Sequence, residues 1–327
     1  MDDHWREPEA KAYSREKGQH EKFMSRIHEA LKKAAQERSA QLAAGGEPTF
    51  LEVADSPSLA LPVREVMPKP PAHTAPIESP GYFRYEDLIK KCASPIWKID
   101  PRMSVFEGGD DGHIGAERFR TLRSRLYQLG GARPLRRVVV TSSVPAEGKT
   151  FVAANLAQSI VRQPDRRVLL IDADLRASRL HQVLGAPRSP GLSDYLRGEV
   201  DEFKAVQKGS DAHLCLIPAG SEVANPSELL LNDRMKQLLE LMTPIFDWII
   251  IDTPPALPVH DASMMADLCD GVLFVVRAGS TDHEMAAKAA AAFQEKNLLG
   301  VVLNRADGDA GYGGYYYSYP TGDEAKK

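Results

Sequence analysis

Residues 143–150, SVPAEGKT, have the types and the spacing that bind a phosphate chain. They lie between the run VVVTS, which predicts a strand, and the run FVAANLAQSI, which predicts a helix. Gly148, Lys149 and Thr150 complete the P-loop pattern, in which backbone N–H groups and a helix N-terminus form an anion cradle. Ser143 replaces the first glycine of the pattern, but a cradle built from backbone groups survives that change. We expect Lys149 to reach the β- and γ-phosphates of a nucleotide and the Thr150 hydroxyl to bind Mg²⁺.

Three carboxylates come at the ends of apolar runs. Asp172 and Asp174 end VLLIDAD, and Asp252 ends WIIID. Asp172 and Asp174 are two residues apart, so an extended strand points both to one side. Ligands bind at the carboxyl edge of parallel sheets, and hard oxygen ligands suit Mg²⁺ that is held jointly with phosphates. A helix cap would explain one such aspartate but explains the set of three poorly.

The elements that must position these residues follow a regular order from residue 114 to residue 305. Apolar strands alternate with amphipathic helices, which predicts an α/β fold with a doubly wound, mostly parallel sheet covered on both faces. The expected strands are RRVVVTS, RVLLIDAD, LCLIPAG, WIIIDTP, GVLFVVRA and GVVLNR, and the expected helices include 114–130, 150–163, 226–242 and 282–296.

The composition limits the class of protein. A formal net charge of −4 argues against a general nucleic-acid binder. The three cysteines are far apart, with neither zinc spacing nor a disulfide framework, which fits a reducing cytosol. The N-terminus is polar and charged, and no apolar run approaches the roughly 20 residues of a membrane span. We expect a cytoplasmic protein unless a partner recruits it to a membrane.

The chain outside the regular region divides into further segments. We expect a charged N-terminal segment, 1–46, with one helix at 23–44, followed by a proline-rich linker, 47–81. The nucleotide-binding domain then takes 82–306. A flexible tail, 307–327, carries five of the ten tyrosines of the chain, Tyr312, Tyr315, Tyr316, Tyr317 and Tyr319.

Several motifs together resemble a known family. The stretches TSSVPAEGKTFVAANLAQSIV, LLIDADLRASRLH and DWIIIDTPP resemble the Walker A, Walker A′ and Walker B motifs of the bacterial tyrosine kinases of polysaccharide export systems. The resemblance continues in GLSDYLRGE, LIPAGSEVANPSELL and GVVLNR, and it covers residues 114–319. Two positions depart from the family pattern. Ala146 stands where the family often has glycine, and Ala177-Ser178 replaces a frequent Arg-Pro.

The resemblance implies a P-loop fold of the ParA/MinD-like type, with ATP and Mg²⁺ as ligands. It implies metal contacts for Thr150, Asp174 and Asp252, and catalytic roles for Lys149 and for Asp172 as the base. The residues expected to contact the nucleotide are Ser143, Glu147, Gly148, Lys149, Thr150, Phe151 and Asn304, the last at the adenine edge.

The helix 114–130 carries a second family feature. Glu117, Arg120 and Arg123 form an E-x2-R-x2-R arrangement, and the helical period places Phe119, Leu122, Leu126 and Leu129 together on an apolar face. A solvated charged face is the alternative explanation of these three charges. In the family, the motif makes the subunit contacts of a ring, so we expect a homo-oligomeric ring in the unphosphorylated state.

The resemblance makes the tail the expected substrate. From Asp307 to Tyr319 an extended chain spans roughly 35 to 45 Å at about 3.3 Å per residue, which is enough to enter a neighbour's site. The five tail tyrosines are therefore the expected phosphoacceptors. The expected partners are a membrane-embedded polysaccharide co-polymerase as activator, which recruits the chain to the inner face of the membrane, and a protein-tyrosine phosphatase.

Three other functions fit part of the pattern. Partitioning and cell-division ATPases of the ParA/MinD kind carry a second lysine where this chain has Val144. A GTPase is suggested by the run from Asn304 to Asp307, but Asp252 is followed by Thr-Pro-Pro and not by x-x-G. An ATP-dependent scaffold that gates polysaccharide assembly without turnover stays open.

Overall fold

The structure is a computed structural model that describes residues 83–107, 110–131, 134–209, 211 and 213–306, with residues 110–113 described by their backbone alone. The expected N-terminal helix 23–44, the linker 47–81 and the tyrosine-rich tail 307–327 lie outside the described residues.

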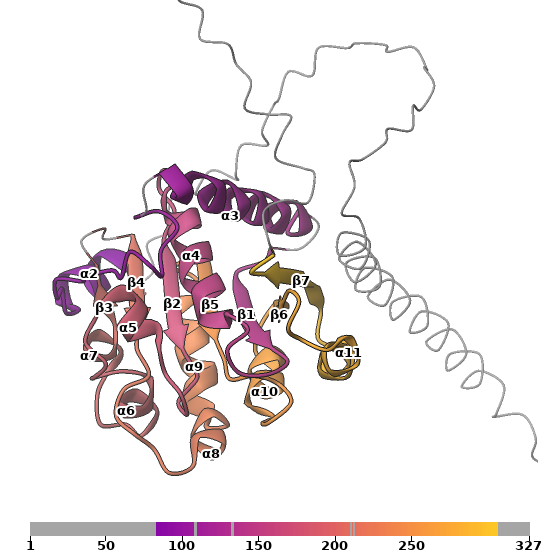
Figure 1. The fold of residues 1–327 in the computed structure, drawn as a ribbon. Coiled ribbons are helices and arrows are strands. Elements are labelled where there is room, and N and C mark those ends of the chain that lie inside the picture. The colour runs from indigo at the N-terminus through magenta and orange to yellow at the C-terminus, as the bar shows by residue number, and fades with distance from the viewer. Residues whose placement is uncertain (1–82, 108–109, 132–133, 210, 212, 307–327) are drawn as a thin grey trace, which may run out of the picture. The chain divides into compact units, whose positions relative to one another are not determined.

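Seven strands within the described residues form one sheet in the order β3-β4-β2-β5-β1-β6-β7 (Figure 1). Neighbouring strands are parallel, except that β3 runs antiparallel to β4. The chain starts in the interior of the sheet and winds to both edges, which confirms the predicted doubly wound, mostly parallel sheet. The strands are β1 (Arg137–Ser142), β2 (Val168–Asp172), β3 (Gln207–Lys208), β4 (Leu214–Ile217), β5 (Trp248–Asp252), β6 (Gly271–Arg277) and β7 (Leu298–Asn304).

The helices are short apart from the pair that covers the middle of the sheet. Within the described residues, none is both long and apolar enough to cross a bilayer. They are α2 (Tyr85–Lys91), α3 (Asp110–Leu129), α4 (Lys149–Val161), α5 (Leu180–Leu184), α6 (Leu192–Leu196), α7 (Glu202–Ala205), α8 (Pro226–Leu230), α9 (Asp233–Met242), α10 (Asp261–Asp267) and α11 (His283–Ala291).

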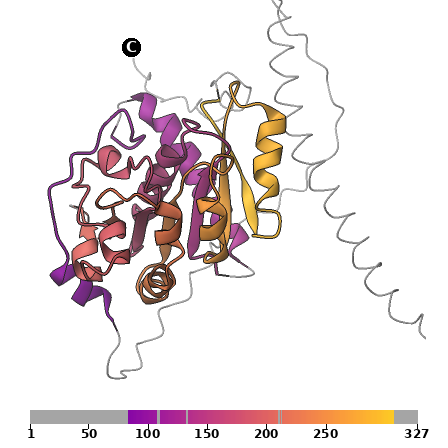
Figure 2. The same cartoon turned by 90° about the horizontal axis from the view of Figure 1, so that it is seen from below.

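The central strands are buried on both faces, which is why they read as continuous apolar runs. Val138 and Val140 of β1 and Ile250 of β5 pack in one cluster with side chains of α3, α4 and α5. Val139 and Ile251 point to the other face and are equally inaccessible to solvent. Right-handed crossovers place α9, α10 and α11 on that second face (Figure 2).

The strand register brings the acidic strand ends together. Asp172 of β2 lies directly opposite Asp252 of β5, and Asp252 lies opposite Val140 of β1. Residues directly opposite each other on neighbouring strands point to the same face, so Asp252 shares with Val140 the face that α4 covers. The first residue of α4 is Lys149, so the fold delivers an ammonium group and two carboxylates to one point.

The structure corrects several predicted boundaries. The expected helix 226–242 is two helices, α8 and α9, because the Asn232 side chain accepts a hydrogen bond from the Arg234 N–H and starts a new helix. The expected helix 282–296 ends at Ala291. In α3, Phe119 and Leu126 are buried as expected, but Leu129 is 51% exposed because it lies in the last turn, at the rim of the apolar face.

Candidate functional site

The P-loop between β1 and α4 holds two residues in the left-handed backbone region. Gly148 has φ +100° and lies at the N-cap of α4. A Cβ built on Gly148 would lie 1.9 Å from Nδ2 of Asn304, so glycine is required by conformation and by space. Ala146 has φ +67°, a region that costs a residue with a Cβ about 1–2 kcal/mol. This conformation explains why glycine suits position 146.

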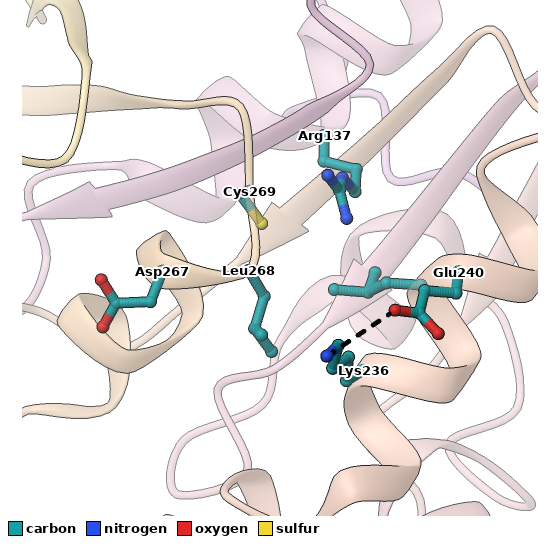
Figure 3. A pocket seen from close by; sticks show the side chains of 7 residues that line it. Arg137, Lys236, Glu240, Asp267, Leu268 and Cys269 are labelled. Atoms are coloured by element: carbon teal, nitrogen blue, oxygen red, sulfur yellow. Dashed lines mark ion pairs between the residues drawn. The ribbon is translucent and has the colours of Figure 1, made fainter.

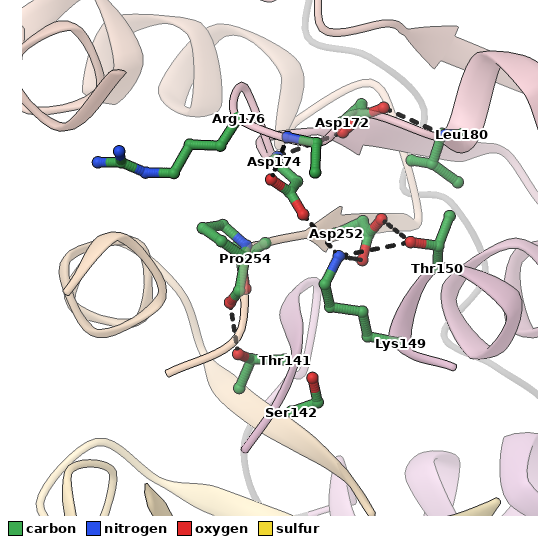
Figure 4. A network of polar contacts seen from close by, with 12 residues as sticks. Thr141, Ser142, Lys149, Thr150, Asp172, Asp174, Arg176, Leu180, Asp252 and Pro254 are labelled. Atoms are coloured by element: carbon green, nitrogen blue, oxygen red, sulfur yellow. Dashed lines mark hydrogen bonds and ion pairs between the residues drawn. The ribbon is translucent and has the colours of Figure 1, made fainter. Parts of the chain in front are cut away.

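Lys149 lies between two of the predicted carboxylates (Figure 4). Its Nζ is 2.7 Å from Oδ2 of Asp174 and 3.7 Å from Oδ1 of Asp252. The Thr150 hydroxyl donates a hydrogen bond of 2.7 Å to Oδ2 of Asp252. The structure therefore brings together the lysine, the hydroxyl and both carboxylates that the sequence predicts to act together.

Asp172 lies behind this group and is fully buried. Its two carboxylate oxygens accept hydrogen bonds of 3.2 Å from the backbone N–H groups of Asp174 and Leu180. Asp174 lies in the loop that follows β2 and Leu180 begins α5, so Asp172 ties the start of that loop to the start of the next helix. Neither of these two hydrogen bonds is donated by a side chain.

The charges in the site do not balance. Three carboxylates, Asp172, Asp174 and Asp252, face the single ammonium of Lys149. Burial raises the pKa of Asp172 well above its usual value, and the charges of Asp252 and Asp174 raise it further. Burial also raises the pKa of Asp252 to about 6, against the opposing effect of Lys149. The pKa of Lys149 is raised, because Asp252 and Asp174 outweigh the opposing effect of its burial.

The donor set fits a divalent cation that is shared with phosphate. Oδ1 of Asp252 is buried and accepts no hydrogen bond, and Lys149 at 3.7 Å is an ion-pair neighbour only. Within the described residues, no cluster of three or more His, Cys, Asp or Glu side chains is arranged to hold a metal ion. A cation here would therefore rely on Thr150 and on phosphate oxygens to complete its ligands, as Mg²⁺ commonly does.

Of the other predicted nucleotide residues, Ser143 has a side chain without a partner in the protein, whereas Phe151 and Asn304 have side chains that contact other residues. Oγ of Ser143 is buried and has no hydrogen-bond partner in the protein, so it is open to a ligand. The Phe151 ring packs edge-on against Phe119 with centroids 5.9 Å apart, in the core and not in the loop. The Asn304 amide donates a hydrogen bond of 2.8 Å to the backbone oxygen of Glu147 and so holds the P-loop from β7.

Glu147 is a support of the loop. Its side chain is buried, and one carboxylate oxygen accepts a 2.7 Å hydrogen bond from the Val144 N–H. The other oxygen accepts from the Thr281 hydroxyl and from the Arg277 N–H at 3.4 Å. The carboxylate is thus used within the protein, and it ties the P-loop to the segment that follows β6.

Sequence reasoning missed one ionic cluster next to the site. Arg176 Nε is 2.9 Å from the buried carboxylate of Asp261, and its Nη2 donates to the Ser227 hydroxyl at 2.7 Å. The cluster joins the loop after β2 to α8 and α10. The only signal in the sequence was the position of Arg176, two residues after Asp174. Nothing in the sequence linked it to Ser227 or Asp261, which are 51 and 85 residues away.

The predicted ring motif is divided between the surface and the core. Glu117 and Arg120 are exposed and form an ion pair with each other on α3. Arg123 turns inward and donates from Nη1 to the backbone oxygen of Ser159 in α4. Arg123 therefore holds α3 on α4, while Glu117 and Arg120 stay accessible to another molecule.

A separate pocket of about 280 Å³ lies at the opposite edge of the sheet (Figure 3). Arg137, at the start of β1, and Cys269, just before β6, are among its lining residues. Because the P-loop follows the carboxyl end of β1, this pocket is not part of the P-loop site. The predicted phosphoacceptors Tyr312, Tyr315, Tyr316, Tyr317 and Tyr319 lie outside the described residues.

Comparisons with known proteins agree with the geometry of the loop. The family model described as the CobQ/CobB/MinD/ParA nucleotide binding domain matches residues 138–316. Tyrosine-protein kinase YwqD of Bacillus subtilis is 37% identical over 193 residues, which cover 58% of this chain and 81% of the relative. Tyrosine-protein kinase wzc of Salmonella typhimurium is 34% identical over 217 residues, which cover 64% of this chain but 30% of the relative.

A solved structure of a tyrosine kinase domain is also similar to this chain in sequence and in fold. The kinase domain of Escherichia coli tyrosine kinase ETK matches with a TM-score of 0.55 and 34% identity. The match covers 61% of this chain and 80% of that chain. Sequence and fold thus agree on the same relatives, although this chain spans under a third of the length of wzc.

The P-loop conformation predicts opposite effects for two matched substitutions. Gly148→Ala is expected to lower the free energy of unfolding by about 1–3 kcal/mol and to weaken nucleotide binding, because the new Cβ meets Asn304. Ala146→Gly should leave stability unchanged or raise it, because it relieves a left-handed alanine. Urea unfolding of both variants measures this, and a clearly destabilised Ala146→Gly would show that the loop backbone differs from the one described.

The raised pKa of Asp252 predicts a pH-dependent cost of burial. The pKa of Asp252 is about 6 in the folded protein and 3.8 in an ordinary carboxyl. The folded state is therefore destabilised fully above pH 6, and this destabilisation disappears as the pH falls toward 3.8. Asp252→Asn should therefore stabilise the nucleotide-free protein at pH 8 by on the order of 1–3 kcal/mol, with the gain shrinking toward pH 5. Thermal unfolding at several pH values tests this, with exposed Asp165→Asn as the near-neutral control. A gain that does not change with pH contradicts it.

Proposed function

Because this chain belongs to the CobQ/CobB/MinD/ParA family of nucleotide-binding domains and, within it, to the bacterial tyrosine kinases, we propose that it transfers the γ-phosphoryl group of ATP to tyrosine. The observation that carries the proposal is the meeting of Lys149, Thr150, Asp174 and Asp252 beside a fully buried Asp172. ATP is the substrate that these groups would bind at the P-loop.

Lys149 is the group that we expect to move when the nucleotide binds. Its ammonium is held by Asp174 and Asp252, and the β- and γ-phosphates offer a stronger concentration of negative charge. The carboxylates then lose their counter-ion. Thr150, Asp174 and Asp252 would hold Mg²⁺ in its place, and the metal, when bound, neutralises charge on the phosphate oxygens.

Asp172 is the proposed base. In the transfer, the phenolic oxygen forms a bond to the γ-phosphorus, the bond to the β-γ bridging oxygen breaks, and ADP leaves. The phenolic proton goes to a carboxylate oxygen of Asp172. A phenol with a pKa near 10 needs such a base at neutral pH, and the raised pKa of Asp172 brings it closer to the working range.

The proposed acceptors are the tail tyrosines of a neighbouring subunit. Glu117 and Arg120 are exposed on α3, which supports their use as contacts in a ring. Each phosphate adds about −1.5 to −2 charge, so a phosphorylated tail would be repelled by the acidic site and by its own phosphates. Autophosphorylation in trans would therefore expel the tails and loosen the ring.

We propose that this cycle controls exopolysaccharide or capsule polymerisation and export, which the resemblance to the tyrosine kinases of polysaccharide export systems supports. We propose that residues 82–306 form the kinase domain and that residues 1–46 and 47–81 form an attachment segment and a linker. A membrane-embedded co-polymerase would recruit the chain to the inner face of the membrane and activate it. A protein-tyrosine phosphatase would reset the tail.

Substitutions at Lys149 and Asp172 should separate binding from chemistry. Lys149→Met is expected to weaken ATP binding and to abolish tail phosphorylation. Asp172→Asn should lower the rate about 100-fold or more but change ATP affinity only slightly, because the base acts in the transfer step. Phosphotyrosine mapping by mass spectrometry after incubation with Mg·ATP measures the rate, and calorimetry measures the affinity. Absence of tail phosphate in the unsubstituted protein, even with the cytoplasmic segment of a candidate activator, rejects the autokinase function.

The exposed charges of α3 allow a matched test of the ring. Arg120→Glu should shift the protein from the oligomer toward the monomer, because it reverses a charge at the proposed contact. Arg118→Glu reverses an exposed charge on the same helix outside the motif and should leave the mass unchanged. Light scattering after size-exclusion chromatography gives the mass. Equal masses for both variants would assign Glu117 and Arg120 to a solvated helix face.

A further inference from the structure

The last strand of the sheet, β7, has an outer edge that no other described strand covers. β7 pairs in parallel with β6, from Leu298 opposite Val272 to Asn304 opposite Arg277, with a register shift between Val272 and Leu273 that skips Leu299, and it ends the strand order. Every second N–H and C=O group of an edge strand points away from its only neighbour. The backbone of β7, the strand at the end of the sheet in Figure 1, therefore offers a row of hydrogen-bonding groups.

The side chains of this edge are apolar. β7 reads LLGVVLN and contains neither a charged residue nor a proline, which are the usual protections of an edge strand. Val301 and Leu303 are each 43% exposed. They lie opposite Phe274 and Val276, so they extend the face that α11 covers on β6. An uncharged edge beside an apolar row is the kind of surface that accepts an added strand.

The nearest candidate for that strand is the tail of the same chain. Residues 307–327 begin three residues after β7 ends at Asn304. Arg305 has φ +55°, which ends the extended backbone of β7. The connection 305–313 that follows contains Asp307, Gly308, Gly311 and Gly313, which are residue types that favour turns. The short connection gives the tail a high effective concentration at this edge, on the order of millimolar for short flexible links.

The tail also has the composition and, in part, the period of a strand. Tyr315, Tyr317 and Tyr319 alternate, so an extended backbone would place all three on one face. Tyrosine is among the residues most favoured in strands. Pro320 follows at once and would end the pairing.

We propose that the tail folds back and pairs antiparallel with the outer edge of β7 in its own subunit. In this register Tyr315 lies opposite Leu303 and Tyr317 opposite Val301, and Tyr319 reaches the irregular start of β7 at Leu299. The rings then cover the exposed Val301 and Leu303, and the backbone groups of β7 gain partners.

The consequence for activity rests on the proposed kinase function. Asn304 contacts the P-loop, so β7 ends at the nucleotide site. An antiparallel tail runs from that end toward the opposite edge of the sheet. In the proposed register Tyr315 stays near that end, while Tyr317 and Tyr319 lie about 10 Å and about 15 Å along the strand from Asn304. The backbone of all three is then paired with β7. Docking on β7 therefore competes with entry into a neighbour's site and holds the tyrosines in reserve.

Hydrogen exchange of the full chain without nucleotide tests the docking independently of catalysis. Amides of residues 312–319 should exchange at least about 10-fold more slowly in the unsubstituted chain than in Tyr317→Pro, which cannot pair at its centre. Ala325→Pro, beyond the paired segment, is the matched control and should behave like the unsubstituted chain. Exchange of residues 312–319 at the rate of an unstructured peptide overturns the proposal.

Two further outcomes would identify another occupant of the edge. Protection that rises with protein concentration would assign the edge to a second copy of the chain. Protection of β7 that Tyr317→Pro leaves unchanged would assign it to something other than the tail. Either result overturns docking of the tail in its own subunit.

A phosphorylation assay tests the consequence. Val301→Lys with Leu303→Lys should raise the initial rate of tail phosphorylation several-fold, because the tail is released. Met285→Lys, at an exposed apolar residue of α11, is the control and should not change the rate. An unchanged rate in the double variant overturns the holding role. If no variant carries phosphotyrosine, the kinase function is wrong, and hydrogen exchange alone decides the docking.

Discussion

The burial of three carboxylates around one ammonium group is the constraint on which the site depends. Asp172 and Asp252 are fully inaccessible to solvent, and Lys149 supplies the nearest positive charge. Burial disfavours the ionised carboxyls and raises their pKa values, so the nucleotide-free site stores unfavourable charge. A divalent cation relieves that charge, and a phosphate chain gives the lysine a new partner. The excess of buried negative charge lowers the free energy of unfolding of the nucleotide-free protein, and the same charge favours the binding of a metal–nucleotide complex.

The surrounding residues keep that charged group in place. Glu147 joins the P-loop to the segment after β6, and Asn304 holds the backbone of the loop from β7. Arg176 with Asp261 fixes the loop after β2 against α10. Each of these bonds joins segments that are far apart along the chain. A P-loop that is supported from several strands can keep its backbone N–H groups aligned without the first glycine of the common pattern.

β7 connects the nucleotide site with the tail. Its last residue, Asn304, contacts the P-loop, and its outer edge is apolar and unpaired by any described strand. The tail that we propose as substrate starts at the same end of the same strand. This short strand thus contacts the P-loop at its carboxyl end and offers the proposed docking edge for the tail tyrosines along its length. This arrangement would let tail availability, and not only catalysis, control the proposed cycle.

The sequence alone determined the sheet class, the P-loop and the acidic strand ends, because these depend on local pattern and on the common edge of parallel strands. It could not give the helix break at Asn232, since a capping side chain competes with a continuous apolar period. It also assigned Glu147 and Phe151 to the nucleotide, and that assignment stays a prediction. What it could not give is the hydrogen bond from the Val144 N–H to the Glu147 carboxylate or the packing of the Phe151 ring against Phe119. The partners of Arg176, and the position of β7 as the last described strand of the sheet, depend on residues far apart in the sequence. Only the tertiary structure decided them, because hydrogen bonds and strand order join residues whose separation leaves no periodic trace in the sequence.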